Sequence, residues 1–146
     1  MASTSIGHAD SRSTVQWVAL AVAAVFAVVG VLGFVPGVTT SYSQMEFAGH
    51  ESEAALLGLF QVSVLHNVVH LLFAVAGFVL ARSNKGAQAF LVVGGAVYLL
   101  LWVYGLVIDM ESAANFVPLN TADNWLHLVL GVGMVGAGLA LGRTRT

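Results

Sequence analysis

The sequence has no cysteine and very little charge. Of its 146 residues, 8% are charged and 58% are hydrophobic, whereas soluble domains carry about 25% charged residues. The absence of cysteine excludes disulfides, thiolate metal ligands and covalent attachment of haem through a C-x-x-C-H motif. Because so few charges leave too little polar surface for a water-soluble fold, the composition predicts an integral membrane protein.

Basic residues are scarce, and their placement is informative. Five Lys and Arg against seven Asp and Glu give a net charge of −2, so the chain lacks the basic stripe that nucleic acid binding requires. All five basic residues lie in connections on one side of the predicted bundle, and every acidic residue except Asp10 lies on the other side. The basic residues are Arg12, Arg82, Lys85, Arg143 and Arg145. Because Lys and Arg concentrate on the cytoplasmic side of membrane proteins, we expect a multi-pass plasma-membrane protein with both termini in the cytoplasm.

Four apolar stretches are each long enough to cross a bilayer, which takes about 20 helical residues. The predicted spans are residues 15–35, 54–81, 87–108 and 122–142. A polar, disordered cytoplasmic tail over residues 1–14 precedes them. Because the connections are short, consecutive helices should be antiparallel neighbours. The sequence thus predicts an all-α, four-transmembrane-helix antiparallel bundle, forming one domain over residues 15–146.

The ends of two predicted helices carry recognisable signals. Pro36-Gly37 stops the first helix. Asn120 or Thr121 caps the fourth helix, and Asp123 lies in its first turn, where a negative charge interacts favourably with the helix dipole. The run from Ala54 to Arg82, in contrast, reads as one uninterrupted helix.

The second and fourth predicted helices resemble each other. Leu65-His66 and Leu126-His127 are followed, at the same distance along the chain, by Arg82 and Arg143. The two helices therefore align without gaps, whereas the first and third share nothing beyond their apolar character. This similarity suggests duplication of a helical pair.

Polar side chains lie inside the predicted spans, where they are costly in hydrocarbon. His66 and His70 lie one turn apart on one face of the second span, and His127 lies at a similar depth on the fourth. Further polar residues accompany them in the outer half of the membrane: Asn67, Asp109, Asp123 and Asn124. Because such groups must face protein, water or a ligand, the sequence predicts a polar cluster there.

Two kinds of cofactor suit this cluster. Three neutral imidazoles, from His66, His70 and His127, suit a divalent metal, and Asp123 or Asp109 adds a carboxylate or orients an imidazole. Alternatively, His66 and His127 ligate one haem b from opposite sides. The residues predicted to bind a cofactor are His66, His70, His127, Asn67, Asp123 and Asn124.

Two interpretations without a cofactor remain open. The same side chains serve as a hydrogen-bonded packing network in a structural or accessory membrane subunit. A proton or ion pathway is the third interpretation, although no acidic or basic residue continues it through the inner halves of the helices. An enzyme is not favoured, because the chain offers no Ser or Cys nucleophile with a paired base.

Several segments together resemble a known family. FQVSVLHNVVHLLFAVAG, AVYLLLWVYGLVID, NFVPLNTADNWLHLVLGVGM and GFVPGVTTSY are similar to small membrane proteins grouped as domain of unknown function 4383, found mainly in actinobacteria. The resemblance implies a four-helical integral membrane protein and carries no activity with it. The positions that match its motifs are His66, Asn67, His70, Asp109, Asn115, Pro118, Asn120, Asp123, Asn124 and His127. Besides the lipid bilayer, glycine-rich helix faces suit a homo-oligomer or a larger membrane complex.

Overall fold

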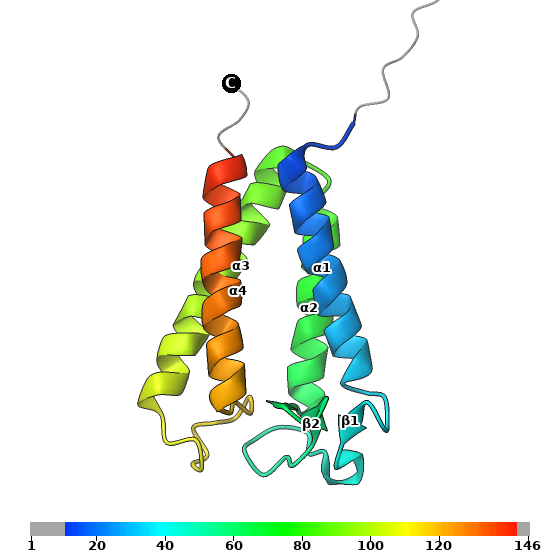
Figure 1. The fold of residues 1–146 in the computed structure, drawn as a ribbon, viewed down its shortest axis with the longest axis vertical. Helices are drawn as coiled ribbons and strands as arrows, with labels where there is room; N and C mark the ends of the chain where they lie inside the picture. The colour runs from blue at the N-terminus through cyan, green and yellow to red at the C-terminus, as the bar shows by residue number, and fades with distance from the viewer. Residues whose placement is uncertain (1–10, 143–146) are drawn as a thin grey trace, which may run out of the picture.

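The computed structural model describes residues 11–142, which form four long helices covered at one end by a small sheet (Figure 1). The helices are α1 (Thr14–Leu32), α2 (Val64–Leu80), α3 (Asn84–Val107) and α4 (Thr121–Leu141). By length and composition, α1, α3 and α4 are able to cross a membrane, and α2 is a shorter apolar helix of 17 residues. The predicted helical bundle is confirmed, and the chain is a multi-pass membrane protein. The predicted tail before Ser11, together with Arg143 and Arg145, lies outside the described residues.

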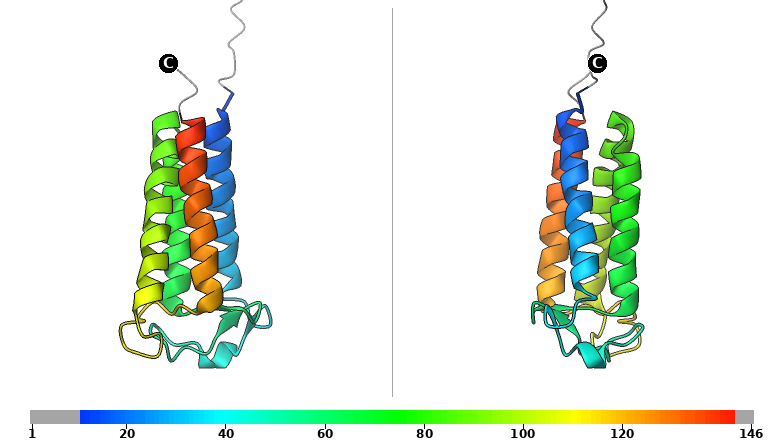
Figure 2. Two further views of the ribbon diagram at one scale, coloured as in Figure 1. Left: turned by 60° about the vertical axis from the view of Figure 1, so that its left-hand side comes forward. Right: turned by 90° about the vertical axis from the view of Figure 1, so that its right-hand side faces the viewer.

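The four helices are arranged as two pairs. α1 packs mainly against α2 and α3 mainly against α4, while the contacts between the pairs are fewer. Figure 2 shows the helices running side by side along their length. Small residues bring the partners of each pair together, because a methyl group on Gly77 of α2 would meet Ala23 of α1, and one on Gly95 of α3 would meet the backbone of α4 at Gly131.

A three-stranded antiparallel sheet covers one end of the bundle (Figure 1). Its strands are β1 (Thr39–Thr40), β2 (Ala55–Leu56) and β3 (Phe60–Gln61), in the order β1-β2-β3, with the 3₁₀ helix η1 (Tyr42–Gln44) after β1. Ala54, Leu56 and Val62 are buried and pack against Val29 and Leu32 at the end of α1. We call residues 38–63 the lid, and the end they cover the lid end.

The predicted second span is wrong in its first third. The helix begins at Val64 rather than Ala54, because residues 54–63 form β2, β3 and their turn, in which Leu57 and Gly58 have φ of 54° and 70°. Ser63 caps α2 by accepting a hydrogen bond from the backbone N–H of His66 at 3.1 Å. The apolar residues of this segment belong to the lid, and an apolar run alone does not distinguish that role from a transmembrane helix.

The other helix ends lie close to the predicted positions. α1 ends at Leu32, before Pro36, and α3 begins at Asn84, one turn earlier than predicted, because Ser83 provides its cap. The predicted cap of α4 is confirmed as a capping box. The Asn120 side chain accepts from the N–H of Asp123 at 2.9 Å, and the Asp123 carboxylate accepts from the N–H of Asn120 at 3.0 Å.

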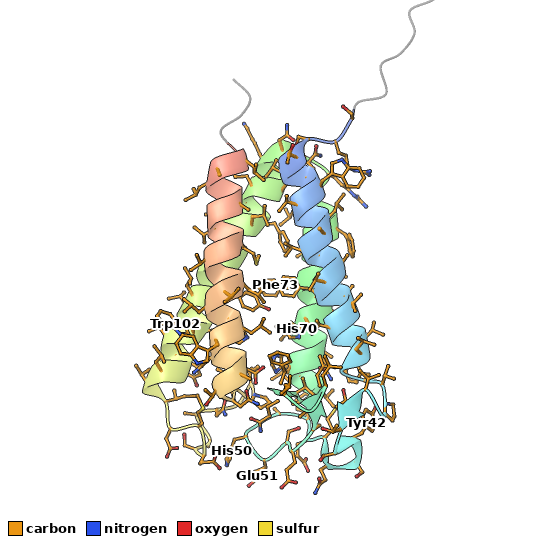
Figure 3. The ribbon with its side chains drawn as sticks, viewed as in Figure 1. Tyr42, His50, Glu51, His70, Phe73 and Trp102 are labelled. Carbon is orange, nitrogen blue, oxygen red and sulfur yellow. The ribbon has the colours of Figure 1, made fainter. Side chains whose placement is uncertain are left out.

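The end opposite the lid gathers the described basic residues. Arg12 and Lys85 line one cavity together with Gly142, and Arg12 and Arg82 line another. The start of α1, the turn between α2 and α3 and the end of α4 therefore lie together at this end. The labelled Glu51 lies in the lid at the opposite end (Figure 3).

Candidate functional site

A cavity of about 250 Å³ lies between the two helix pairs, beneath the lid. Its polar lining comes from α2, α3 and α4, and each of these side chains is at most 9% exposed: His66, His70, Tyr98, Asp123 and His127. The remaining lining residues are apolar and come from α1, α4 and the lid. Figure 3 shows the labelled His70 between the two helix pairs. The structure therefore places the three histidines of the predicted cluster around one space.

A continuous row of five rings crosses all four helices at this level. The ring centroids of His66 and His70 on α2 are 4.7 Å apart, and His70 stacks on Phe26 of α1 at 5.8 Å. Phe26 in turn stacks on Tyr98 of α3 at 5.4 Å, and Tyr98 meets His127 of α4 edge-on at 5.0 Å. Such ring contacts fix the orientation of the imidazoles without using their nitrogen atoms.

The Nδ1 atoms of His66, His70 and His127 are buried and have no hydrogen-bond partner within the described part of the chain. The ring of His66 lies close to the backbones of Gln61 and Pro118. A neutral imidazole has one donor nitrogen and one acceptor nitrogen, so each Nδ1 atom is able to form a hydrogen bond. A buried polar atom without a partner costs about 1–3 kcal/mol, which indicates that a hydrogen-bonding partner is missing at these nitrogens.

Asp123 holds the lid against α4. Its carboxylate accepts a hydrogen bond from the backbone N–H of Gln61 in β3 at 3.1 Å, in addition to the capping bond from Asn120. The Asn120 side chain donates to the carbonyl of Leu59 in the lid at 2.8 Å. Because both hydrogen bonds to the carboxylate come from backbone N–H groups, the role of Asp123 in the described structure is to position the cavity roof.

Three other residues of the predicted cluster do not line the cavity. Asn67 is buried against Gly33 at the end of α1, and Asn124 is buried against Gly105 of α3. Asp109 is exposed beyond the end of α3, where it accepts a hydrogen bond from the backbone N–H of Glu111 at 3.0 Å. The structure therefore does not bring these side chains to the imidazoles.

Comparison with known proteins identifies the family. The family model described as "Domain of unknown function (DUF4383)" matches residues 16–140. The chain belongs to the DUF4383 family. The resemblance predicted from its motifs is thus confirmed, and the match takes in the lid and nearly the full length of the helices, so the cavity lies inside the DUF4383 domain. No curated protein and no solved structure matches the chain.

Two aromatic residues of the site in this DUF4383 protein lie outside the set predicted to bind a cofactor. Phe26 and Tyr98 line the cavity and connect His70 to His127. One signal was available in the sequence, since each aromatic residue lies two turns before a glycine, Gly33 at the end of α1 and Gly105 in α3. Aligning α1 with α3 on these glycines places the two rings at equivalent positions.

Neither predicted cofactor finds support in the arrangement of the DUF4383 residues. Among residues 11–142, no three His, Asp or Glu side chains come together at a spacing that could hold a metal ion. The cavity volume of about 250 Å³ is below the range of about 300–1,000 Å³ that is usual for drug-sized ligands, and a porphyrin is larger still. The donor atoms are suitable, but the arrangement of the described residues supports neither a metal site nor haem b.

Proposed function

We propose that this DUF4383 protein is a plasma-membrane protein that binds a small organic molecule with a hydrogen-bond donor in the cavity beneath its lid. The supporting observation is that His66, His70 and His127 line one open space, and that the buried Nδ1 atom of each has no hydrogen-bond partner among the described residues. Ligand sites typically combine apolar walls with a few convergent polar groups. A hydroxyl or amine group would supply the hydrogen-bonding partner that the described residues do not provide.

A purely structural role for the histidines explains the observations less well. A buried polar network stabilises a fold when its members are fully satisfied, and an unsatisfied one is costly. His66 and His70 contact each other through their rings, and His127 contacts Tyr98 in the same way, while their Nδ1 atoms stay without partners among the described residues. These contacts favour a ligand site over a packing network.

A proton or ion pathway is also less well supported. Beside His70, the rings of Phe26, Phe73 and Tyr98 pack against one another at centroid distances of 5.4–5.8 Å. Of these three rings, Tyr98 alone carries a hydrogen-bonding group, so they offer no continuous chain of such groups toward the opposite end. The cavity is better explained as a binding pocket with a closed floor.

Thermal unfolding of the purified protein in detergent tests the proposal with phenol and toluene as probes. A ligand that binds only the folded state raises Tm by mass action. The two probes have similar shape, but only phenol donates a hydrogen bond. We therefore expect phenol to raise Tm more than toluene does at equal concentration.

A matched pair of variants locates the effect in the cavity. Leu130→Phe reduces the space, because Leu130 lines the cavity, whereas Val129→Phe changes a neighbouring side chain that is 66% exposed. The phenol shift should disappear in the first variant and persist in the second. Equal shifts with phenol and toluene in the wild-type protein would overturn the proposal, and stabilisation by Zn²⁺ but not by phenol would favour a metal site instead.

A further inference from the structure

The lid closes the cavity toward one end of the bundle. Leu56 and Val62 of the lid line the cavity and are themselves buried. Two hydrogen bonds, Gln61 N–H to Asp123 and Asn120 Nδ2 to the Leu59 carbonyl, attach this part of the lid to α4. This part of the roof is thus apolar on its inner side and tied down, whereas Leu57 of the lid also lines the cavity and is 63% exposed, at the edge of the opening.

The side of the cavity between α1 and α4 is open by comparison. Val25 of α1 and Leu126 of α4 both line the cavity, yet they are 54% and 36% exposed. α1 and α4 also make few contacts with each other, since each packs mainly against its own partner. The cavity therefore extends to the lateral surface of the bundle, which in a transmembrane protein faces lipid chains.

The lining of this lateral opening is apolar. Val25, Val29, Leu126 and Leu130 form it on the two helices, and the unpartnered nitrogen atoms lie further inside. A molecule that matches this change from an apolar opening to a polar interior has a polar head at the histidines and a hydrocarbon portion at the surface of the bundle. The volume of about 250 Å³ suits the head alone, so the rest of a larger molecule would lie between α1 and α4.

The charges around the cavity restrict the chemistry of the head. The lining residues include one acidic side chain, Asp123, whose carboxylate already accepts two backbone hydrogen bonds, and they include no Lys or Arg. A phosphate or carboxylate head would find no cation to pair with there, which is costly in a buried site. A neutral hydroxyl, in contrast, donates to an imidazole nitrogen without bringing a charge.

We infer that the ligand is a lipid-soluble alcohol or phenol that reaches the cavity from the bilayer between α1 and α4, with its hydroxyl at the histidines and its hydrocarbon tail in the lateral opening. The inference rests on the proposed function, since it requires that the cavity bind an organic ligand. It adds the chemical class of that ligand and the route by which it arrives.

Binding of 4-nonylphenol, phenol and nonylbenzene to the full-length protein in phosphatidylcholine nanodiscs tests the inference. Val25→Trp places a large side chain in the opening, and Val28→Trp is the matched control, because Val28 is on the same helix, is 55% exposed and does not line the cavity. We expect Val25→Trp to weaken 4-nonylphenol binding by about tenfold or more, which is about 1.4 kcal/mol, because the indole occupies the space that the tail requires in the opening. Val28→Trp should leave it unchanged.

The three probes separate the ways in which the inference could fail. Phenol should bind Val25→Trp as well as it binds the wild-type protein, which also shows that this variant is folded. If 4-nonylphenol binds both Trp variants equally while phenol still binds, the lateral route is wrong and the proposed function stands. If nonylbenzene binds as tightly as 4-nonylphenol, the hydroxyl assignment is wrong. If none of the probes binds the wild-type protein, the proposed function itself fails.

Discussion

The side chain of Asn67 on α2 occupies the space beside Gly33, the residue that follows α1, where a methyl group would overlap the Asn67 amide. Asn124 on α4 has the same relationship to Gly105 on α3. Both asparagines are buried, and the Oδ1 atom of each lacks a hydrogen-bond partner among the described residues. Within each helix pair, a glycine of one helix or its end therefore packs against an asparagine of the other helix.

The correspondence between the pairs extends to the cavity. One turn after each asparagine comes a histidine, His70 or His127, and each histidine contacts an aromatic ring on its partner helix, Phe26 or Tyr98. These two rings stack on each other where the pairs meet. The structural register thus matches His70 with His127, whereas the alignment predicted from the sequence matches His66 with His127. Two helical hairpins with this same arrangement therefore build the site, and they bring His70 and His127 to the cavity from opposite pairs.

Gly33→Ala should destabilise the protein. The added methyl group would overlap the Asn67 amide, and overpacking of a close contact costs about 1–3 kcal/mol. Gly133→Ala is the control, because a Cβ at Gly133 meets nothing within 4 Å, and the same substitution in an exposed helical position adds about 0.5–1 kcal/mol of stability. Thermal unfolding in detergent measures both, and equal Tm values for the two variants would contradict the packing described for Gly33.

Removing the asparagine should relieve that strain. In Gly33→Ala/Asn67→Ala, the space vacated by the amide accommodates the new methyl group, so the double variant should lose less stability than the two single variants combined. Contacting residues typically show coupling of about 0.5–3 kcal/mol. A double-mutant cycle of the free energies of unfolding measures this coupling. Strict additivity would mean that the two side chains do not compete for the same space.

The sequence was sufficient to predict the helices but not the lid. The length of an apolar run and a capping residue such as Asn120 are local features of the sequence. They predicted the ends of the last two spans to within about one turn. The segment from Ala54 to Ser63 is also mostly apolar. Its strands form by pairing with each other and with Thr39–Thr40, and several of its apolar side chains line the cavity. Those contacts are distant in sequence, so local composition does not reveal them.

The sequence predicted only those residues of the candidate site whose polar side chains stand out within an apolar helix. His66, His70 and His127 attract attention because imidazoles are unusual in an apolar helix, and the structure places all three around the cavity. Phe26 gives no such contrast, since it is one apolar residue among many. Asn67 shows the opposite case, because its polarity is conspicuous although its contact is with Gly33 at the end of the partner helix.

Asp123→Ala should loosen the lid and shorten α4 at its start. The change removes the acceptor of the backbone N–H groups of Gln61 and Asn120, and each buried donor left without a partner costs about 1–3 kcal/mol. Hydrogen exchange at these two amides should accelerate, and Tm should fall. Glu51→Ala provides the comparison, because Glu51 is an exposed residue of the lid. If both amides stay as protected as in the wild-type protein, the carboxylate does not hold the lid.

The orientation of the protein in the membrane is testable with single cysteines, because the natural chain contains none and every label then reports one position. Lys85 lies at the end of the bundle opposite the lid, and Glu51 lies in the lid. If the basic end faces the cytoplasm, a membrane-impermeant maleimide should label Glu51→Cys in intact cells and should label Lys85→Cys only after the cells are lysed. Both variants should react equally in detergent, which controls for intrinsic reactivity. Labelling of Lys85→Cys but not Glu51→Cys in intact cells would mean that the lid faces the cytoplasm, and a ligand drawn from the bilayer would then come from the inner leaflet.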